Sequence, residues 1–195
     1  MQSNSNHISA SQPRSASLHE QDGATIIEFA VAAPIMILAV VGFIEIALMF
    51  FASTVLEGAA NVASRMGKTG FTPTEISRER FIRGEIERLS GGFLSPELVN
   101  IRILSYKDFS LIGLPEPCTR PNDRPPCRNG FEDINGNGRW DADQGKEGVG
   151  SARDAVLYTI TYNWQVITPF MRAVLTETGG SYELSAITAV KNEPF

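Results

Sequence analysis

One apolar stretch of membrane length constrains this chain more than any other feature. Nearly every residue from Ala24 to Leu56 is apolar, yet Glu28 lies near its start and Glu45 lies further along it. A charged side chain at the centre of a bilayer costs roughly 2.5–3.5 kcal/mol on insertion scales, so each carboxylate requires a specific explanation. Along a helix the two residues are roughly 25 Å apart, and the hydrocarbon core is about 30 Å thick. We therefore expect one carboxylate near each membrane interface.

The predicted helix is longer than one bilayer requires. From Ala24 to Leu56 it would span roughly 50 Å. Its outer half must therefore bury its apolar surface, either against the protein's own head or against neighbouring subunits. Pro34 lacks a backbone donor, which suggests a local kink or a melted turn. The alternative is a plain single-span anchor in which Glu28 is tolerated by snorkelling or protonation.

The residues before the apolar stretch form a polar leader. Met1 to Asp22 is rich in Ser, Asn and Gln, and this composition predicts disorder. An ordinary secretory signal has a basic segment, a short apolar segment and then its cleavage site. Here the plausible cleavage point, between Gly23 and Ala24, precedes the apolar run. We expect the residues before Ala24 to be disordered.

Composition excludes several functional classes. The formal net charge is −5 and no basic patch is present, which argues against a nucleic-acid partner. The only two histidines, His7 and His19, lie in the leader, so a histidine-based hydrolase in the remaining chain is excluded. No P-loop or dinucleotide fingerprint occurs. We therefore predict a protein that is not an enzyme and has no small-molecule substrate.

The two cysteines, Cys118 and Cys127, lie in one predicted loop. If this part of the chain is exported, a disulfide between them is the natural interpretation, and free thiols are the alternative. The charges around the apolar stretch suggest the opposite orientation. Arg14 precedes the stretch, whereas Arg65 and Lys68 follow it, a weak bias that would place the head inside.

The remaining chain predicts a small α+β head. Alternating apolar residues predict strands near residues 98–106, 155–164 and 182–190, with a short helical turn near 171–175. The second strand has an aromatic face, which fits core packing better than a carbohydrate- or base-stacking platform. An antiparallel sheet packed on the outer half of the long helix would bury apolar surface for both partners.

A further helix is predicted before the first strand. Thr72 followed by proline is typical of a helix start. Ile82, Ile86 and Leu89 then share one face, and Gly91 follows as a stop signal. The fold prediction is therefore a long membrane-spanning helix packed on an antiparallel sheet with one or two helices.

The segment from Asp133 to Gln144 has the spacing of a calcium loop. Oxygen-bearing side chains occupy positions 1, 3, 5 and 9, and a glycine occupies position 6. The candidate ligands are Asp133, Asn135, Asn137 and Asp141, with the backbone carbonyl of Arg139 at position 7 and Gln144 at position 12, where Asp143 or Glu147 would substitute. Two asparagines lower the ligand charge, so we expect a weak structural site, in the range of roughly 10⁻⁴–10⁻³ M. The alternative is an Asn/Gly-rich turn held by hydrogen bonds without metal.

The motif Gly23-Ala24-x-x-x-Glu28-Phe29, followed by Pro34 and the long apolar helix, resembles the TadE family. These proteins are minor pilins, or pseudopilins, of the tight-adherence (Tad/Flp) pilus system, a branch of type IV pili. Three later segments are also similar to TadE-like heads, at residues 133–143, 154–162 and 191–195.

The resemblance implies a pilin-like life cycle. A prepilin peptidase would cleave between Gly23 and Ala24, and Glu28 would pair with the Ala24 amine of an adjacent subunit. Residues 1–23 would be a cytoplasmic leader, 24–56 the transmembrane and pilin-like helix, and 57–195 a periplasmic head. The protein would span the bacterial inner membrane once and reach the pilus or cell surface after assembly. Its partners would be the peptidase, other pilin subunits and the Tad assembly platform.

The predicted function is therefore structural. The protein would be a minor pilin at the tip or base of a Tad pilus, where it would prime assembly and support surface adherence. Two alternatives stay open. One is a calcium-dependent adhesin-like head on a membrane or pilus stalk, and the other is a pseudopilin of a type II secretion system.

Overall fold

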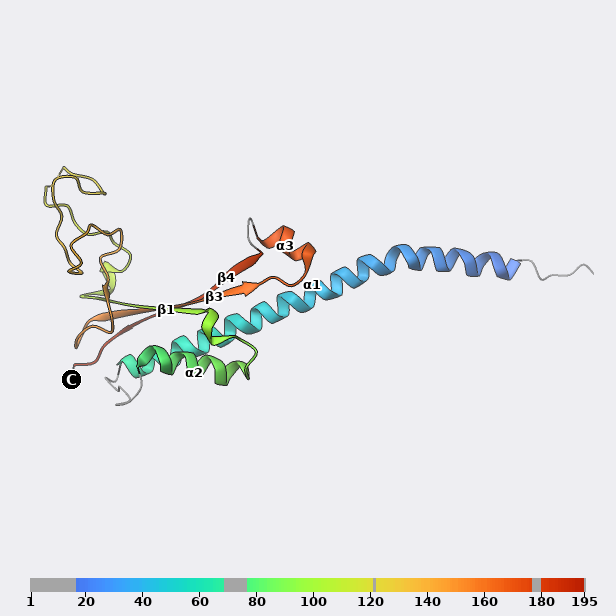
Figure 1. Ribbon diagram of the computed structural model, residues 1–195, viewed down its shortest axis with the longest axis horizontal. Helices are drawn as coiled ribbons and strands as arrows, with labels where there is room; N and C mark the ends of the chain where they lie inside the picture. The colour runs from blue at the N-terminus through green and yellow to red at the C-terminus, as the bar shows by residue number, and fades with distance from the viewer. Residues whose placement is uncertain (1–16, 69–76, 121, 177–179, 195) are drawn as a thin grey trace, which may run out of the picture. The chain divides into compact units, whose positions relative to one another are not determined.

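The structure is a computed structural model that describes residues 17–68, 77–120, 122–176 and 180–194. The chain divides into two compact units, Met1–Ile44 and Glu45–Phe195, and we call the second the head unit. The elements in chain order are α1 (Ser17–Lys68), α2 (Arg78–Ser90), the 3₁₀ turn η1 (Pro96–Leu98), β1 (Val99–Tyr106), the 3₁₀ turn η2 (Phe109–Leu111), β2 (Lys146–Glu147), β3 (Ala155–Gln165), α3 (Pro169–Leu175) and β4 (Ser181–Lys191) (Figure 1).

The first unit, as far as it is described, is the N-terminal part of α1. Its apolar side chains are largely exposed, as Ile27, Phe29 and Ile35 illustrate. The stretch Gly23–Met66 is the one helix of the described residues that is long and apolar enough to cross a membrane. The helix is uninterrupted at Pro34, so the melted turn expected there is absent. A proline removes only one backbone bond, which the rest of a long helix can tolerate.

The start of α1 corrects the prediction of a disordered leader. The helix begins at Ser17, so residues 17–22 are helical, while the earlier leader residues lie outside the described part of the chain. The helix therefore extends from the apolar run backwards into the polar sequence.

In the head unit, the outer half of α1 supplies one face of the core. Small and branched side chains recur on one face of this helix at intervals of three and four residues. The buried residues are Ala52, Val55, Leu56, Ala59, Ala60 and Ala63. Because most of them are alanines, the backbone of α1 can approach its neighbours closely. This confirms the predicted burial of the outer half against the protein's own head.

The helix α2 packs in the same core. Ile82 and Ile86 are fully buried, as predicted, whereas Leu89 is exposed at the edge of the helix. The helix starts later than predicted, with Ser77 as its N-cap, because the Ser77 hydroxyl accepts the N–H of Arg80 at 3.4 Å. The predicted start at Thr72 lies outside the described residues. Gly91 ends the helix in the left-handed conformation, with φ of 59°.

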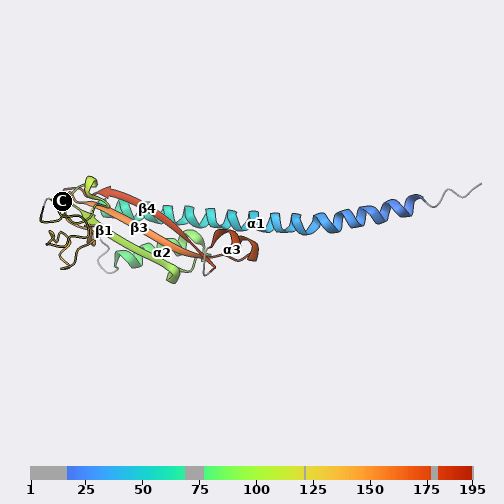
Figure 2. The same ribbon diagram turned by 90° about the horizontal axis from the view of Figure 1, so that it is seen from above.

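Four antiparallel strands form one sheet in the order β2-β1-β3-β4. The central strand β3 pairs with β4 along its whole length, from Ala155 opposite Lys191 to Gln165 opposite Ser181. The three long strands match the predicted ones, and the two-residue β2 was not predicted. Figures 1 and 2 show β3 and β4 running beside the outer half of α1, with α2 beside the same half.

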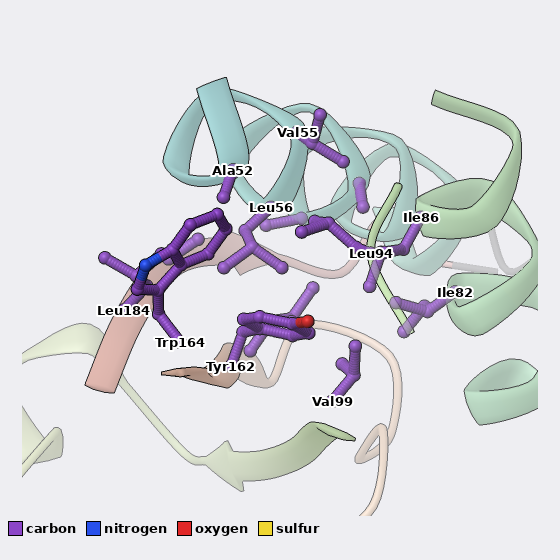
Figure 3. Close-up of a cluster of buried hydrophobic side chains, with 14 of the residues drawn as sticks. Ala52, Val55, Leu56, Ile82, Ile86, Leu94, Val99, Tyr162, Trp164 and Leu184 are labelled. Carbon is purple, nitrogen blue, oxygen red and sulfur yellow. The ribbon is translucent and has the colours of Figure 1, made fainter. Parts of the chain in front are cut away.

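The aromatic face of β3 lies inside this core. Tyr158, Tyr162 and Trp164 are buried between the sheet and the helices, as the close-up shows for the last two (Figure 3). Phe93 joins them, with its ring centroid 5.9 Å from those of both Trp164 and Phe51. The core-packing interpretation of the aromatic face is therefore confirmed, and this face is not available as a binding platform.

Candidate functional site

The predicted cleavage and assembly residues all lie on the exposed N-terminal part of α1. Gly23, Ala24 and Glu28 are helical and exposed. Ala24 and Glu28 are four residues apart, so they lie on the same face of the helix, one turn from each other. Pairing of Glu28 with an amine requires cleavage and a second subunit. Both events therefore stay predictions.

The second acidic residue of the apolar stretch, Glu45, has a specific role in the head unit. Its side chain is buried and accepts hydrogen bonds from the segment that connects β3 to α3. Oε1 accepts the N–H of Ile167 at 2.5 Å, and Oε2 accepts the N–H of Thr168 at 3.1 Å as well as the Thr168 hydroxyl. From the other side, the Arg172 guanidinium donates to the Val166 carbonyl at 2.9 Å. Glu45 thus fixes the start of α3 against α1.

Replacing Glu45 with alanine should loosen this attachment. The substitution leaves two backbone N–H groups and one hydroxyl without their acceptor, at a cost of about 2–3 kcal/mol in unfolding free energy. For a chain of this size we expect the Tm to fall by roughly 5 °C or more, measured by circular dichroism of the full chain in detergent. Glu57→Ala, at an exposed position of the same helix, is the matched control. Equal Tm values for Glu45→Ala and Glu57→Ala would contradict this role of Glu45.

Glu116 organises the long irregular segment between β1 and β3. Its side chain is fully buried. Oε1 accepts the N–H of Ile134 at 2.9 Å, and Oε2 accepts the N–H of Asp141 at 3.0 Å. Its own backbone N–H donates to the Asp141 carbonyl at 3.0 Å, and its carbonyl accepts the indole N–H of Trp140 at 3.0 Å. One residue therefore holds both ends of the predicted calcium loop.

The cysteine loop adjoins Glu116. Cys118 and Cys127 are joined in a disulfide, with their Cα atoms 5.3 Å apart. Inside the closed ring, the Asp123 carboxylate accepts the N–H groups of Asn129 and Arg128 at 2.9 and 3.1 Å. The bond from Asn129 is the strongest of several that lower the pKa of Asp123, so the carboxylate stays charged. The disulfide and this carboxylate together order the small loop.

The predicted calcium ligand at position 1 makes hydrogen bonds within its own turn. Asp133 Oδ1 accepts the N–H groups of Gly136 and Asn137 at 2.7 and 3.1 Å, and Oδ2 accepts that of Gly138 at 2.8 Å. Gly136 and Gly138 have φ of 80° and 77°, values that favour glycine. The hydrogen-bonded turn that was predicted as the alternative to calcium is therefore present.

The ligands at positions 3, 5 and 9 lie together. Asn135 and Asn137 donate their side-chain amides to Asp141 Oδ2 at 2.7 and 2.5 Å. Their Oδ1 atoms accept backbone N–H groups, from Asn137 and Arg139 respectively. The hydrogen bonds from these two side-chain amides lower the pKa of Asp141 most, and the positive charges of Arg139 and Arg102 lower it further. Amide nitrogens rather than oxygens thus face the carboxylate.

The remaining candidates point to other partners. Asp143 accepts the Tyr106 hydroxyl at 2.9 Å and the N–H of Gly145 at 3.0 Å. Burial, followed by the bond to Asp143, raises the pKa of Tyr106 well above its ordinary value, so the hydroxyl stays a donor. Gln144 is buried and its amide donates to the Leu111 carbonyl at 3.4 Å. Gln144 is therefore bonded away from the cluster at Asp141. Asp143 lines the same cleft as Asp141, although its carboxylate already accepts these two hydrogen bonds.

This arrangement fits a hydrogen-bonded turn better than a preformed calcium site. Within the described ranges, no group of three or more His, Cys, Asp or Glu side chains could hold a metal ion. The loop residues line a cleft of about 500 Å³, in which the positive charges of Arg102, Arg139 and Lys146 lie beside the carboxylates of Asp141, Asp143 and Glu147. The amides of Asn135 and Asn137 would have to rotate to present their oxygens. Calcium binding therefore stays a prediction, at weak affinity.

Calcium has a direct thermal test. If the loop binds it, several millimolar calcium should raise the Tm of the full chain, because an ion that binds only the folded state stabilises it by mass action. The same concentration of magnesium is the ion control. Asp141→Asn should abolish the shift, whereas Asp108→Asn, at an exposed position outside the loop, should retain it. An unchanged Tm of the unmodified protein in calcium would rule out calcium binding by the loop.

Glu116 is testable by an isosteric change. Glu116→Gln replaces one acceptor oxygen with an amide that faces a backbone donor, and it removes a charge that strengthens both bonds. We expect a loss of about 2 kcal/mol or more, together with new protease cuts between residues 130 and 145 detected by mass spectrometry. Glu132→Gln, exposed in the same segment, should have neither effect. Identical digestion patterns would show that Glu116 does not organise the segment.

Sequence reasoning missed both buried carboxylates that organise the head unit. Glu45 was noticed as a charge in an apolar stretch, but its partners are 122 and 123 residues away in sequence. Glu116 lies between two prolines in a segment without periodicity, and no local pattern indicates its burial. Only the tertiary structure shows that both side chains accept backbone N–H groups.

The fold defines a class of protein. A long N-terminal apolar helix, packed on a four-stranded antiparallel sheet with further helices, is an α+β architecture of the pilin type. Residues 23–65 match the family model TadE, described as "TadE-like protein". The chain thus contains a TadE-like domain, which includes Gly23, Ala24, Glu28 and Glu45. No curated protein and no solved structure matches the chain.

The match supports a coarse functional assignment. A TadE-like domain indicates a protein associated with the Tad pilus, a system in which such components are generally not enzymes. The long apolar helix is consistent with a single-pass membrane anchor. Most of the head unit lies beyond the matched residues, so the family match does not assign its specific role.

Proposed function

We propose that this protein is a structural minor pilin of a Tad pilus, cleaved between Gly23 and Ala24 and assembled at the tip or base of the fibre. One observation carries the proposal: the TadE-like segment is a single helix used in two ways. Its N-terminal part exposes apolar side chains, whereas its outer half is buried in the head unit. A subunit built in this way can exchange lipid for neighbouring apolar helices without exposing its core.

Glu28 would fix the register of that exchange. An unpaired carboxylate among apolar helices is costly, whereas a pair with a free amine offsets much of the cost. Cleavage after Gly23 creates such an amine at Ala24. Because Glu28 is exposed on α1, a neighbouring subunit can reach it. The pair would favour one axial position of the incoming subunit over all others.

The cysteine loop supports a periplasmic location for the head unit. Disulfides persist in oxidising compartments, including the bacterial periplasm. The Cys118–Cys127 bond closes a loop beside Glu116. With the head outside, the leader would be cytoplasmic and accessible to the peptidase at the membrane. We assign the head a role in priming assembly and supporting adherence, through contacts with the Tad platform and other pilins.

The first test is the N-terminus of the membrane form, sequenced with and without the prepilin peptidase. We expect a chain that begins at Ala24 only when the peptidase is present. Glu28→Ala should be processed normally but should be at least several-fold depleted from sheared pili, because the register contact is lost. Glu57→Ala, at an exposed position on the outer half of the same helix, serves as the control.

The outcomes separate the alternatives. An uncleaved N-terminus in both strains would leave a plain membrane anchor. Processing with normal pilus incorporation of Glu28→Ala would contradict the pairing role alone. Co-purification with a type II secretion platform, instead of Tad components, would favour the pseudopilin alternative. Normal pilus formation without the protein, together with lost surface attachment, would favour an adhesin-like head.

A further inference from the structure

Five exposed apolar side chains come from two parts of the head unit that meet at one groove, the start of its α1 segment and the β3–α3 connection with α3. We call this set the apolar collar, and it consists of Ile46, Phe50, Ile167, Phe170 and Val174. Phe50 is 70% exposed, Ile167 and Val174 are 66% exposed, and Phe170 is 59% exposed. Exposed aromatic and branched residues grouped in this way mark a surface that contacts another apolar phase.

The collar adjoins Glu45 at the start of the head unit's part of α1. Glu45 is the first residue of the head unit, and its carboxylate accepts the N–H groups of Ile167 and Thr168. The helix α3 starts immediately afterwards, at Pro169. Figure 1 shows α3 at the end of the sheet where β3 stops and β4 begins. The collar is therefore attached to a defined point on α1.

Helix arithmetic places that point at the edge of a bilayer. With Glu28 near one interface, Glu45 lies roughly 25 Å further along α1, close to the opposite edge of a hydrocarbon core about 30 Å thick. Phe50 lies roughly 7 Å beyond Glu45. The headgroup zone occupies about 5–8 Å on each side of the hydrocarbon. The collar thus falls within the depth of the lipid headgroups.

The polar groups near the collar suit the same environment. The exposed Arg172 lies between Phe170 and Val174 in α3, and its guanidinium donates to the Val166 carbonyl. Arginine at this depth can extend toward lipid phosphates while its stem covers apolar surface. Beside α3, the apolar groove of about 300 Å³ between Met49, Phe50 and Leu175 continues the collar along α1.

We propose that the apolar collar is a lipid-contact surface that rests the head unit on the outer leaflet of the membrane before assembly. Ile167 and Phe170 insert at the level of the headgroups, and Arg172 binds lipid phosphate. The surface holds the head at a fixed depth and tilt relative to the bilayer. The inference requires only that α1 spans a membrane, so it rests on the anchor and not on cleavage or pilus assembly.

Spin labelling tests the proposal in the uncleaved full chain. A nitroxide is attached to Phe170→Cys, Val174→Cys or Ile187→Cys in nanodiscs of phosphatidylethanolamine and phosphatidylglycerol. The native cysteines are paired and do not react. Ile187 is the matched control, because it is 63% exposed but roughly 20 Å along β4 from the collar. Power saturation with oxygen and with a water-soluble nickel chelate then measures the surroundings of each label.

We expect the ratio of oxygen accessibility to nickel accessibility to be several-fold higher at position 170 than at position 187. Position 174 should give an intermediate ratio. Water-like values at 170 equal to those at 187 would overturn the proposal. Low values for both reagents, with line broadening that disappears on dilution with unlabelled chain, would also overturn it and assign the collar to a second copy. Each variant must keep the Tm of the unmodified protein within about 2 °C to be scored. Because these chains are uncleaved, failure here leaves the minor-pilin proposal intact.

Discussion

The head unit depends on the close packing of the outer half of α1 against its sheet. Ala52, Ala59 and Ala60 are buried with almost no exposed surface, so the backbone of the helix itself lies against neighbouring side chains. Buried aromatic residues of β3, chiefly Tyr158 and Trp164, fill the space that these small residues leave. The complementarity has a functional consequence. The protein's own sheet covers one face of the outer half, so other partners are needed by the N-terminal half and by exposed residues such as Ile46 and Phe50.

Glu45 marks the boundary between these two halves. Before Glu45, the apolar side chains of α1 are mostly exposed. After it, one face of the helix is buried in the core of the head unit. A carboxylate at this point is tolerated because it accepts two backbone N–H groups and a hydroxyl from the β3–α3 connection. Breaking such a bond leaves buried groups unsatisfied, so the position of α3 is strongly specified. The same contact places Ile167 beside Glu45, directly before α3 begins at Pro169.

Much of this fold could be predicted from local pattern, and the exceptions have physical reasons. Strands β3 and β4 alternate in burial over most of their length, because one face packs on the main core. The end of β1 does not alternate, since Leu104 and Tyr106 belong to a second small buried cluster. The two-residue β2 has no periodicity to detect, and it exists only because it pairs with Leu104 and Ser105. The start of α1 was placed too late, since a polar composition predicts disorder even where the local helix signals are favourable. Leu89 was predicted to share one helix face with Ile82 and Ile86, and it is the one of the three that is exposed.

The irregular segment between β1 and β3 was the least predictable part, because buried and hydrogen-bonded carboxylates supply much of its order, beside a small apolar cluster that includes Leu111 and Ile112. Asp133, Asp123 and Glu116 each accept two or more backbone N–H groups, and together they satisfy donors that a sheet or helix would satisfy elsewhere. Spacing predicted metal ligation at Asp133 because the same side chains serve both purposes. The difference lies in the buried Glu116, an acceptor from outside the motif. The Glu116 side chain accepts the backbone N–H groups of Ile134 and Asp141, and so ties two points of the loop together without being one of its spaced ligands. These internal acceptors bridge parts of the segment that are far apart in sequence, and calcium binding stays a prediction beside them.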